Sequence, residues 1–358
     1  MGFVKGIINA LLDPKYFLVM AVVLLFVVLW KREKIASNVV GYGVLGFLAA
    51  FFLWGTLDPN FRLIVTKPDN VPIVGLIFLL VFFVWYSIRE AVLNDRRISA
   101  GQGPIEKDEA DRVWVWPDLV YTELISLILC SVVLIVWSIL LKAPLEQPAN
   151  PANTPNPSKA PWYFLGLQEM LVYFDPWLAG VVLPGLIIVG LIAIPYIDKN
   201  PKGNGYFTFK ERKAEISIFL FGFAVLWVSL IVLGTFLRGP NWNFFGPFEF
   251  WDIHKLEALT NVNLSEYFWV RLLKTGMPSF WLIRELPGIL LVLVYVFALP
   301  VILSKNVFKS YYEKLGPPRY YVSVFLFLAM MSLPLKMLSR WIFNLKYVVN
   351  IGEYFFNI

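Results

Sequence analysis

The chain has 358 residues, of which 58% are hydrophobic and only 16% are charged. Soluble domains usually carry about a quarter charged residues, so this composition argues against a soluble enzyme, a disordered tail and a nucleic-acid binder. The net charge of +6 and the 17% aromatic content are typical of a membrane protein, whose cytoplasmic loops collect Lys and Arg and whose interfaces collect aromatic residues.

Long apolar runs predict an all-α, polytopic membrane protein with about eight transmembrane helices. A hydrocarbon core about 30 Å thick needs roughly 20 apolar residues of helix. These runs are too long for strands, and lipid tolerates only helices and closed barrels. The first run has no small-residue cleavage site after it, so we expect it to remain as an anchor. The eight predicted spans are 14–30, 39–57, 71–93, 119–141, 177–197, 214–237, 286–304 and 320–345.

Basic residues gather in alternate loops between these spans. By the positive-inside rule, this asymmetry places the basic loops in the cytoplasm and both termini outside. The four basic loops contain Lys31, Arg32 and Lys34; Arg96, Arg97, Lys107 and Arg112; Lys199, Lys202, Lys210, Arg212 and Lys213; and Lys305, Lys309, Lys314 and Arg319.

Changes in composition divide the chain into four parts. We predict three N-terminal transmembrane helices in 1–100, a functional region in 113–237, an aromatic-rich outer segment in 238–284, and two more spans in 285–358. The aromatic-rich segment is too polar to span a membrane, so its rings are expected to lie on the membrane surface. These rings belong to Trp242, Phe244, Phe245, Phe248, Phe250 and Trp251.

The functional region contains a proline-rich loop followed by a short amphipathic stretch. Residues 143–161 hold six prolines, which favour an ordered, extended loop outside the membrane. Pro161 then opens a stretch whose apolar spacing predicts a helix lying in the interface, with Gln168 and Glu169 on its other side. The apolar positions are Phe164, Leu165, Leu167, Met170, Leu171 and Phe174. A proline turn, an indole and a phenol beside an acid suit a hydrophobic ring that carries polar oxygens.

The order of motifs in this region resembles the C-terminal half of cytochrome b, the form encoded separately as subunit IV. In that family a Trp-Pro entry leads into a helix, a proline-rich loop reaches a Pro-Glu-Trp-Tyr motif at the quinol-oxidation pocket, and a later helix ends in Val-Pro and an acid. The matching positions are Trp116-Pro117, Pro148 to Pro157, Ala160-Pro161-Trp162-Tyr163 and Ile194-Pro195-Tyr196-Ile197-Asp198.

The resemblance implies a quinol pocket lined by Pro161, Trp162, Tyr163 and Phe164, with quinol as substrate. The family's Pro-Glu pair is replaced here by Ala160-Pro161, so the glutamate that accepts a quinol proton is missing. Glu169 is our candidate to replace it, acting with Tyr163, and Asp175 is the second candidate. An acid at the interface is suited to accepting and releasing a proton. Alternatively, Glu169 is a solvated interfacial charge and the two aromatic residues are belt residues.

A second, cytoplasmic-side quinone pocket is a weaker hypothesis. Asp118, Tyr121 and Glu123 lie at the start of the fourth predicted span. An acid within a membrane span is a functional candidate by default. Because Glu123 lies near the N-terminal end of its span, at the level of the lipid headgroups, we favour a role as an anchor over a role as a quinone ligand.

Two other features of the spans carry expectations. Lys336 and Arg340 are four residues apart in the last span, and we expect both side chains to snorkel to the outer headgroups. Small residues at Gly41, Gly43 and Gly46 predict a close approach of helices, or space for a flat cofactor held by another subunit.

The chain has one histidine, His254, and one cysteine, Cys130. These residues cannot supply bis-histidine haem ligation, a haem-attachment motif or an iron–sulfur site, so we predict no metal site in this chain. His254 is expected at a surface, and Cys130 is expected to pack in its helix. The resemblance therefore implies that haem b, haem c and iron–sulfur groups belong to partners. The expected partners are a haem-bearing cytochrome b N-terminal-like subunit and a Rieske-type iron–sulfur or c-type cytochrome subunit, with lipid around them and no nucleic acid.

The leading hypothesis is a haem-free subunit of a bc-type respiratory complex that is inactive alone. It would form the quinol pocket with the haem-bearing subunit, in electrogenic electron transfer from quinol to a high-potential iron–sulfur or cytochrome c partner, with protons translocated outward. The alternative is a structural membrane anchor of a redox complex with a degenerate quinone pocket. A secondary transporter is disfavoured because the predicted spans have apolar centres.

Overall fold

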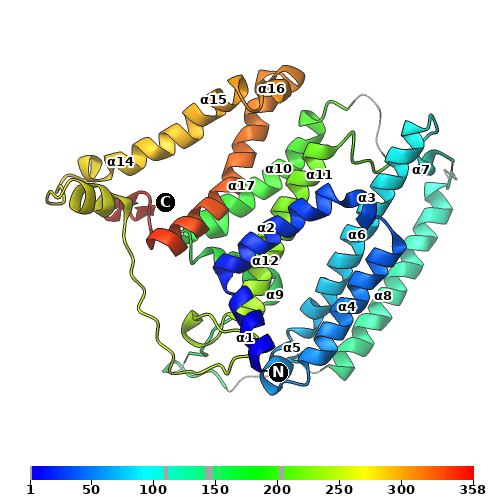
Figure 1. Ribbon diagram of the computed structural model, residues 1–358, viewed down its shortest axis with the longest axis horizontal. Coiled ribbons are helices and arrows are strands. Elements are labelled where there is room, and N and C mark those ends of the chain that lie inside the picture. The colour runs from blue at the N-terminus through cyan, green and yellow to red at the C-terminus, as the bar shows by residue number, and fades with distance from the viewer. Residues whose placement is uncertain (1, 109–111, 142–147, 153, 201–204) are drawn as a thin grey trace. The chain divides into compact units, whose positions relative to one another are not determined.

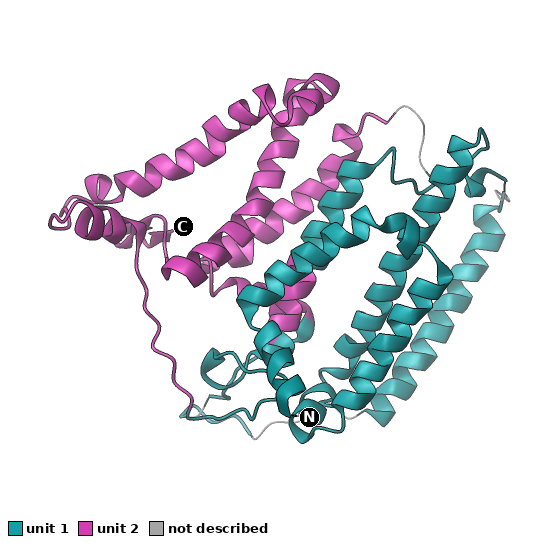
Figure 2. Ribbon diagram, in the orientation of Figure 1, with its two compact units in different colours: residues 1–162, 204–225, 235–254 teal, residues 163–203, 226–234, 255–358 magenta. Residues whose placement is uncertain are grey.

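The computed structural model describes residues 2–108, 112–141, 148–152, 154–200 and 205–358, and these fold into two compact units (Figures 1 and 2). Unit 1 comprises 1–162, 204–225 and 235–254, and unit 2 comprises 163–203, 226–234 and 255–358. Two parts of the predicted proline-rich loop, 143–147 and 153, lie outside the described residues, as does the predicted loop residue Lys202. Each unit therefore combines segments from several of the four parts expected from composition.

Unit 1 consists of helices that are joined by short turns. The π-helical turn Val115–Leu119 leads into α8, and another, Phe221–Trp227, follows α11. The helices are α1 (Gly2–Leu11), α2 (Pro14–Trp30), α3 (Arg32–Ile35), α4 (Asn38–Gly55), α5 (Pro59–Val65), α6 (Val71–Ser99), α7 (Ile105–Asp108), α8 (Val120–Leu140) and α11 (Lys213–Leu220), with a 3-10 turn at Pro240–Trp242.

Unit 2 is also helical and ends in a small hairpin. The strands β1 (Asn350–Ile351) and β2 (Phe356–Asn357) pair antiparallel, with Asn350 opposite Asn357, around the 3-10 turn Gly352–Tyr354. The helices are α9 (Trp162–Met170, whose first residue belongs to unit 1), α10 (Leu183–Ile197), α12 (Val228–Val232), α13 (Leu264–Glu266), α14 (Trp281–Leu293), α15 (Leu299–Lys305), α16 (Lys309–Leu315) and α17 (Pro317–Phe343). Its π-helical turns are Leu178–Val182, Tyr267–Leu272 and Val294–Ala298, while Phe221–Trp227 and Leu233–Leu237 each have residues in both units.

The prediction of about eight transmembrane helices is confirmed. Within the described part of the chain, seven helices are long and apolar enough to cross a membrane, or eight if α1 and α2, bent by 78°, form one broken span. The seven are Asn38–Gly55, Val71–Ser99, Val115–Leu140, Leu178–Ile197, Lys213–Leu237, Trp281–Lys305 and Pro317–Phe343. The chain is thus an all-α integral membrane protein.

Side-chain caps explain where several N-terminal helices begin. Asp13 accepts a hydrogen bond from the Lys15 amide and is followed by Pro14, while Asp58 accepts from the amides of Asn60 and Phe61 at 2.8 and 3.2 Å. Such caps satisfy amide groups that have no partner within the helix. Proline after the cap costs nothing, since its missing N–H would be unpaired there.

Asp58 also anchors α1 through a buried ion pair. The Lys5 ammonium donates to the Asp58 carboxylate at 2.5 Å. Burial by itself raises the pKa of Asp58, but the hydrogen bond from Lys5 and the amides of Phe61 and Asn60 outweigh burial, so the pKa is lowered overall. The carboxylate is therefore charged in the folded protein.

The aromatic-rich segment after the sixth span packs into unit 1. The Phe248 ring stacks on Phe61 with a centroid distance of 5.0 Å and contacts Trp54 at 5.5 Å. The Phe248 amide also donates to the Asn9 side chain at 3.1 Å. The expectation that these aromatics lie on the membrane surface is therefore wrong for Phe248 and Phe245, which are buried. A segment whose aromatic rings pack on other rings has the same composition as one whose rings lie at the membrane surface, so composition alone does not distinguish the two.

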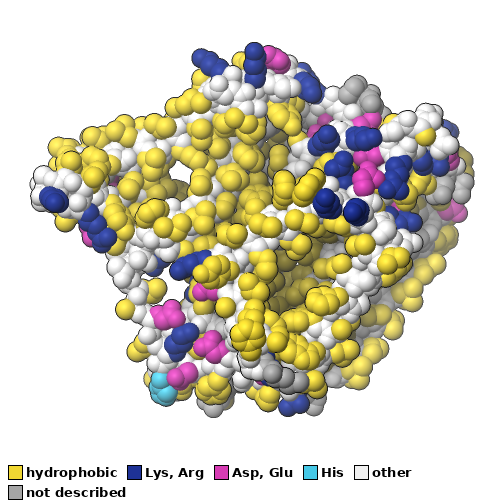
Figure 3. All heavy atoms as spheres, in the orientation of Figure 1, with side chains coloured by type: hydrophobic (Ala, Val, Ile, Leu, Met, Phe, Trp, Pro, Cys, Tyr) yellow, Lys and Arg dark blue, Asp and Glu magenta, His cyan; other side chains and the backbone are white. Residues whose placement is uncertain are grey.

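Charged residues gather at the end of α6. Asn94 is fully buried, and its amide donates to Glu106 at 2.9 Å and to the Phe207 carbonyl at 3.0 Å. The neighbouring Asp95 accepts from the Lys210 amide at 3.1 Å. Figure 3 shows basic and acidic side chains together over this end of unit 1, where Arg96 also pairs with Glu33. These contacts fix two of the basic loops to the end of α6.

The core of unit 2 lies along α17. Tyr320 is completely buried and its hydroxyl donates to the Pro300 carbonyl at 3.0 Å, while the Tyr295 hydroxyl donates to the Leu328 carbonyl at 2.7 Å. Gly288 of α14 allows the chain near Val348 to approach closely, because a Cβ there would lie 2.0 Å from the Val348 carbonyl oxygen. The helices α14 to α17 and the C-terminal hairpin therefore form one packed group.

Candidate functional site

The proline-rich loop before α9 is held in place within unit 1. The Asn156 side-chain amide donates to the Asn241 side-chain oxygen at 2.8 Å, and the Asn241 backbone amide donates back to Asn156 at 2.7 Å. Lys159 donates to the Thr235 carbonyl at 3.0 Å, and its ammonium lies 5.1 Å from the centre of the Trp251 ring. These contacts hold residues 156–159 of the loop in place ahead of Pro161.

The predicted ligands of the quinol ring lie at the start of α9. Pro161 is exposed and Trp162 is half-buried where the helix begins. Tyr163 and Phe164 are each about half exposed, at 51% and 52%, and their ring centroids are 4.6 Å apart. The structure thus presents two adjacent aromatic rings on the outer side of α9.

Glu169 lies on the opposite, buried side of the same helix. Its side chain is 0% exposed, and it accepts a hydrogen bond from the hydroxyl of Tyr173, also buried, at 3.2 Å. The expectation that Glu169 lies on a polar outer face is therefore wrong. The buried face of α9 packs on protein, because Gly166 lies close to Trp227 and Ile231. The spacing of apolar residues in the sequence therefore does not identify a side of α9 that faces lipid.

Asp175, the second candidate acid, is held by groups near the C-terminal hairpin. It accepts from the Tyr347 hydroxyl at 3.1 Å and from the Asn357 side-chain amide at 3.3 Å. Burial and the hydrogen bond to Asp175 raise the pKa of Tyr347, so this phenol stays protonated and keeps donating. Both acids therefore accept from a phenol. Asp175 accepts from Tyr347 near the C-terminal hairpin, whereas Glu169 accepts from Tyr173, four residues further along its own segment.

Lys336 of α17 lies near Phe174 and Tyr347, and its position differs from the one that we expected from the sequence. Its side chain is buried, at 5% exposure, and its ammonium donates to the Ile358 carbonyl at 3.2 Å. The same ammonium lies 5.9 Å from the ring centres of both Phe174 and Tyr347. The expectation that Lys336 snorkels to the headgroups is therefore wrong, because the C-terminal hairpin covers it. A basic residue in an apolar span was the signal available in the sequence.

Arg340, one turn further along α17, lies at the edge of the same segment. It is half-buried and donates to the carbonyl groups of Thr260 and Asn344 at 3.4 and 3.3 Å. The next residue, Trp341, contacts the Tyr173 ring edge-on with a centroid distance of 6.0 Å. The last span therefore packs against Tyr173 through Trp341.

The three residues of the weaker, cytoplasmic-side hypothesis are not brought together. Asp118, Tyr121 and Glu123 are all exposed on the helical stretch that leads into α8. Two consecutive steps of an α-helix rotate by about 200°, so Glu123 projects from a different side of the helix than Tyr121. This chain alone does not form a pocket from these side chains.

The residues present do not fit a haem held by two histidines. The chain has a single histidine, His254, and it is exposed in the segment that follows α11 and its continuation. Within the described ranges, no three His, Cys, Asp or Glu side chains are grouped as metal ligands would be. Cys130 is exposed on α8, which corrects the expectation that it packs inside the protein.

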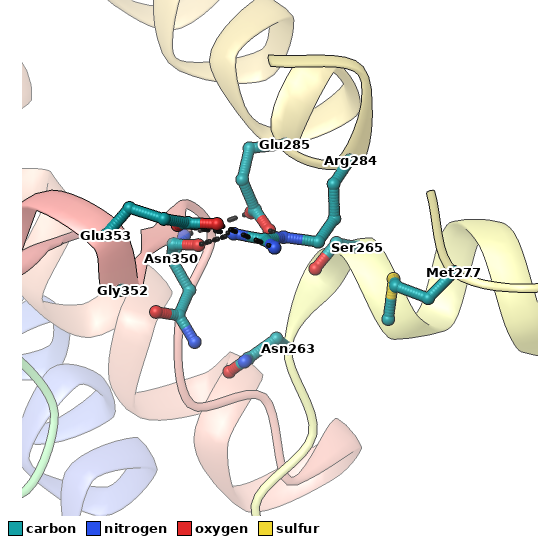
Figure 4. A pocket seen from close by; sticks show the side chains of 8 residues that line it. All are labelled: Asn263, Ser265, Met277, Arg284, Glu285, Asn350, Gly352 and Glu353. Carbon is teal, nitrogen blue, oxygen red and sulfur yellow. Dashed lines mark hydrogen bonds and ion pairs between the residues drawn. The ribbon is translucent and has the colours of Figure 1, made fainter. Parts of the chain in front are cut away.

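A cavity of about 320 Å³ lies elsewhere in unit 2. Figure 4 shows the Arg284 guanidinium extended between two carboxylates, and it donates to Glu353 at 2.9 Å and to Glu285 at 3.1 Å. The Glu285 carboxylate is buried and accepts from the Asn350 amide at 3.0 Å. Both acids bind the Arg284 guanidinium, so these contacts hold the C-terminal hairpin against α14. The lining residues are Asn263, Ser265, Met277, Arg284, Glu285, Asn350, Gly352 and Glu353.

Comparison with known proteins finds one family in this part of the chain. Residues 148–248 match the family model described as cytochrome b (C-terminal)/b6/petD. No solved structure matches the chain. The match confirms the suspected family, but it is shifted from the predicted region: it omits α8 and extends to Phe248. It includes most of the proline-rich loop, α9 and the two spans that follow, so the chain is an integral membrane protein in which residues 148–248 are similar to the C-terminal region of cytochrome b.

Proposed function

We propose that the chain is a haem-free membrane subunit of a bc-type quinol-oxidising complex. It forms the outward quinol pocket with a separate subunit that carries haem b. Electrons pass from quinol to a high-potential iron–sulfur or c-type cytochrome partner and to the haems of the neighbouring subunit. The protons leave to the outside, which makes the reaction electrogenic and places the complex in a respiratory chain of a prokaryotic-type membrane.

The observation that carries this proposal is the buried Glu169–Tyr173 pair within the matched region. A fully buried carboxylate 3.2 Å from a phenol is placed to take a proton and pass it on. Tyr163 lies six residues earlier on α9, which corresponds to about 9 Å along the helix axis. In this proposal Glu169 takes the place of the missing motif glutamate from the buried side of α9, while the aromatic pair lies on the exposed side.

The aromatic residues at the start of α9 supply binding rather than proton transfer. Tyr163 and Phe164 offer two adjacent exposed rings, and a quinol ring packs on such faces through offset or edge contacts. The Tyr163 hydroxyl is the donor for a quinone oxygen. Pro161 and Trp162 fix the point where the chain enters the helix.

The exposed helix α8 is the proposed contact with the haem-bearing subunit. None of its residues is buried, and its mean hydropathy is as high as 2.5 over the span. Inside a bilayer, such a helix is covered either by lipid or by another subunit. Its Trp116-Pro117 entry carries the resemblance to the family at this point, which favours a subunit.

Isolation of the native complex tests the proposal. We expect the chain to purify with a protein whose dithionite-reduced spectrum shows b-type haem, and the complex to oxidise quinol. Glu169→Gln should lower turnover by about 100-fold, the size typical of a lost proton acceptor. Tyr173→Phe, which removes one hydroxyl, should shift the pH profile of turnover. Glu266→Gln, at a partly exposed acid paired with Arg271, is the matched control and should leave turnover unchanged.

A structural anchor is the second candidate. It is favoured by Ala160-Pro161 in place of Pro-Glu. The cavities of about 320 and 190 Å³ also favour it, because neither is lined by the predicted quinol-pocket residues. If Trp162→Ala and Tyr163→Ala change neither quinol turnover nor binding of a pocket inhibitor, the anchor replaces the proposal. Loss of inhibitor binding in both variants supports the quinol pocket.

A further inference from the structure

The cavity of about 320 Å³ lies where α13, the start of α14 and the C-terminal hairpin meet. All three segments belong to unit 2, and the family match at residues 148–248 does not include them. A single water takes up only about 30 Å³ of liquid, so this volume suits a small organic group rather than one water or one ion.

Three neutral polar side chains of the cavity make no hydrogen bond with the described residues. Ser265 of α13 is buried, at 3% exposure, and its hydroxyl points into the cavity (Figure 4). Asn263 precedes α13 without capping it, and its side chain lines the cavity together with that of Asn350. Sheltered polar groups are normally paired in proteins, so these three side chains indicate a polar ligand.

The charged groups that line the cavity exclude an anionic ligand. The Arg284 guanidinium already donates through Nε to Glu285 at 3.1 Å, and through Nη1 and Nη2 to Glu353 at 3.1 and 2.9 Å. Two carboxylates therefore face one guanidinium, and the lining carries a net charge of one negative unit. This charge repels an anion and attracts a cation.

The Glu285 carboxylate can accept further hydrogen bonds. It is only 2% exposed, and its Oε1 accepts from Arg284 while its Oε2 accepts from the Asn350 backbone amide at 3.0 Å. An ionised carboxylate has about four lone-pair sites, so each oxygen retains one. With the Ser265 hydroxyl and the two asparagine carbonyl oxygens, these sites suit a cation that donates several hydrogen bonds. A primary ammonium has three N–H donors.

We propose that this cavity binds a primary ammonium group through the oxygens of Ser265, Asn263, Asn350 and Glu285. A quaternary ammonium has the same charge but no N–H donor, and a neutral alcohol has a donor but no charge, so both bind more weakly. The proposal does not depend on quinol oxidation, because none of these residues belongs to the predicted quinol pocket.

The aromatic residues beside the cavity place it at the membrane interface. Trp281, the first residue of α14, contacts Tyr354 of the hairpin turn with a ring centroid distance of 5.8 Å, and Tyr354 is exposed. Tryptophan and tyrosine are enriched at the level of the lipid headgroups. An ammonium group reaches this level either as part of a phospholipid headgroup or as a soluble amine.

Native mass spectrometry of the full-length chain in detergent tests the site. Dioleoylphosphatidylethanolamine should remain bound, whereas dioleoylphosphatidylcholine, which differs only by three methyl groups on nitrogen, should bind about tenfold more weakly. Ser265→Ala should weaken the ethanolamine lipid by about tenfold, because it removes one hydrogen bond to a charged group. Ser304→Ala is the matched control: Ser304 is also buried, its hydroxyl donates to the Val301 carbonyl at 2.7 Å, and it does not line the cavity.

Ethanolamine without a lipid distinguishes the two sources of the ammonium. If millimolar ethanolamine raises the melting temperature of the delipidated wild-type chain but not that of Ser265→Ala, the ligand is a soluble amine. If it has no effect while the ethanolamine lipid is retained, the ligand is a headgroup. The Ser265 hydroxyl has no partner among the described residues, so its loss should leave the melting temperature of the delipidated chain unchanged.

Three outcomes would overturn the proposal. The first is equal retention of the ethanolamine and choline lipids, and the second is equal affinity of wild type and Ser265→Ala for the ethanolamine lipid. The third is the absence of binding by both the ethanolamine lipid and free ethanolamine.

Discussion

Two helices of similar length, α8 and α17, show what hydropathy does and does not determine in this chain. The span that contains α8 has a mean hydropathy of 2.5 and none of it is buried, whereas the span of α17 has a mean hydropathy of 1.8 and 33% of it is buried. The less apolar helix is therefore the better packed one. Inside a membrane, apolar surface gains little by leaving lipid, so burial follows packing and polar contacts instead.

The contacts of α17 show which interactions achieve this packing. Its Tyr320 hydroxyl bonds the Pro300 carbonyl, its Arg319 guanidinium bonds the Tyr196 carbonyl at 2.7 Å, and its Lys336 ammonium bonds Ile358. Along α8, by contrast, the Thr122 and Ser138 hydroxyls bond carbonyls of their own helix. The difference lies in the polar groups that reach other elements.

The largest expected effect is the loss of packing at Tyr320. Tyr320→Ala removes a fully buried ring and should lower the free energy of unfolding by about 3–5 kcal/mol. Leu134→Ala on α8, at a position 67% exposed, should change it by less than about 0.5 kcal/mol. Denaturant titration of the isolated chain in detergent measures both. Equal losses would mean that α8 is packed within the chain after all.

The second prediction uses the chain's single cysteine as a reporter on α8. Cys130 is exposed in the isolated chain, so a membrane-permeant maleimide should label it readily. In the native complex, the proposed haem-bearing subunit covers α8, and labelling should slow by about tenfold, because reactivity follows access. Mass spectrometry of the labelled chain gives the two rates. Identical rates would indicate that lipid, not a subunit, surrounds this helix in the complex.

The smallest effect concerns the ion pair that anchors α1 within the unit that contains α8. The pKa of Asp58 is lowered in the folded state, so its stabilising contribution is complete above the unfolded-state pKa and is lost as pH falls through the lowered value. We expect a loss of about 1 kcal/mol on acidification from pH 5 to pH 3. Asp58→Asn keeps the cap but removes the charge, so it should show a smaller acid loss.

Comparison with Leu134→Ala completes that experiment. This variant should show the same acid-dependent loss as the wild type, since α8 takes no part in the Lys5–Asp58 contact. An acid response that Asp58→Asn leaves unchanged would assign the titration to another group.

The sequence was sufficient to predict the number of spans and the family, because both depend on patterns that survive without tertiary contacts. Apolar runs of the right length predicted the helices, and the order of Trp-Pro, proline-rich loop and Pro-Trp-Tyr suggested the family whose model matches residues 148–248, a range that leaves out Trp116-Pro117. The roles of Pro161, Trp162, Tyr163 and Phe164 remain predictions, which the experiments above test.

The sequence could not tell which apolar faces pack on protein and which face lipid. Glu169 shares a helix side with Leu165, and only the neighbouring Trp227 and Ile231 make that side buried. Lys336 is hidden by a hairpin more than ten residues further on. Phe248 is stacked on Phe61 from a distant part of the chain. In each case the deciding contact is non-local, and no period of the local sequence encodes it.

The reciprocal amide pair between Asn156 and Asn241 has a consequence for biogenesis. The two residues are 85 positions apart, and α9, α10, α11 and α12 lie between them. The clasp can therefore close only after the intervening spans have been threaded through the bilayer. Asn241 adopts a left-handed backbone with φ 56°, which asparagine tolerates better than most residues. The Asn156–Asn241 pair therefore cannot hold the proline-rich loop until residue 241 has been synthesised.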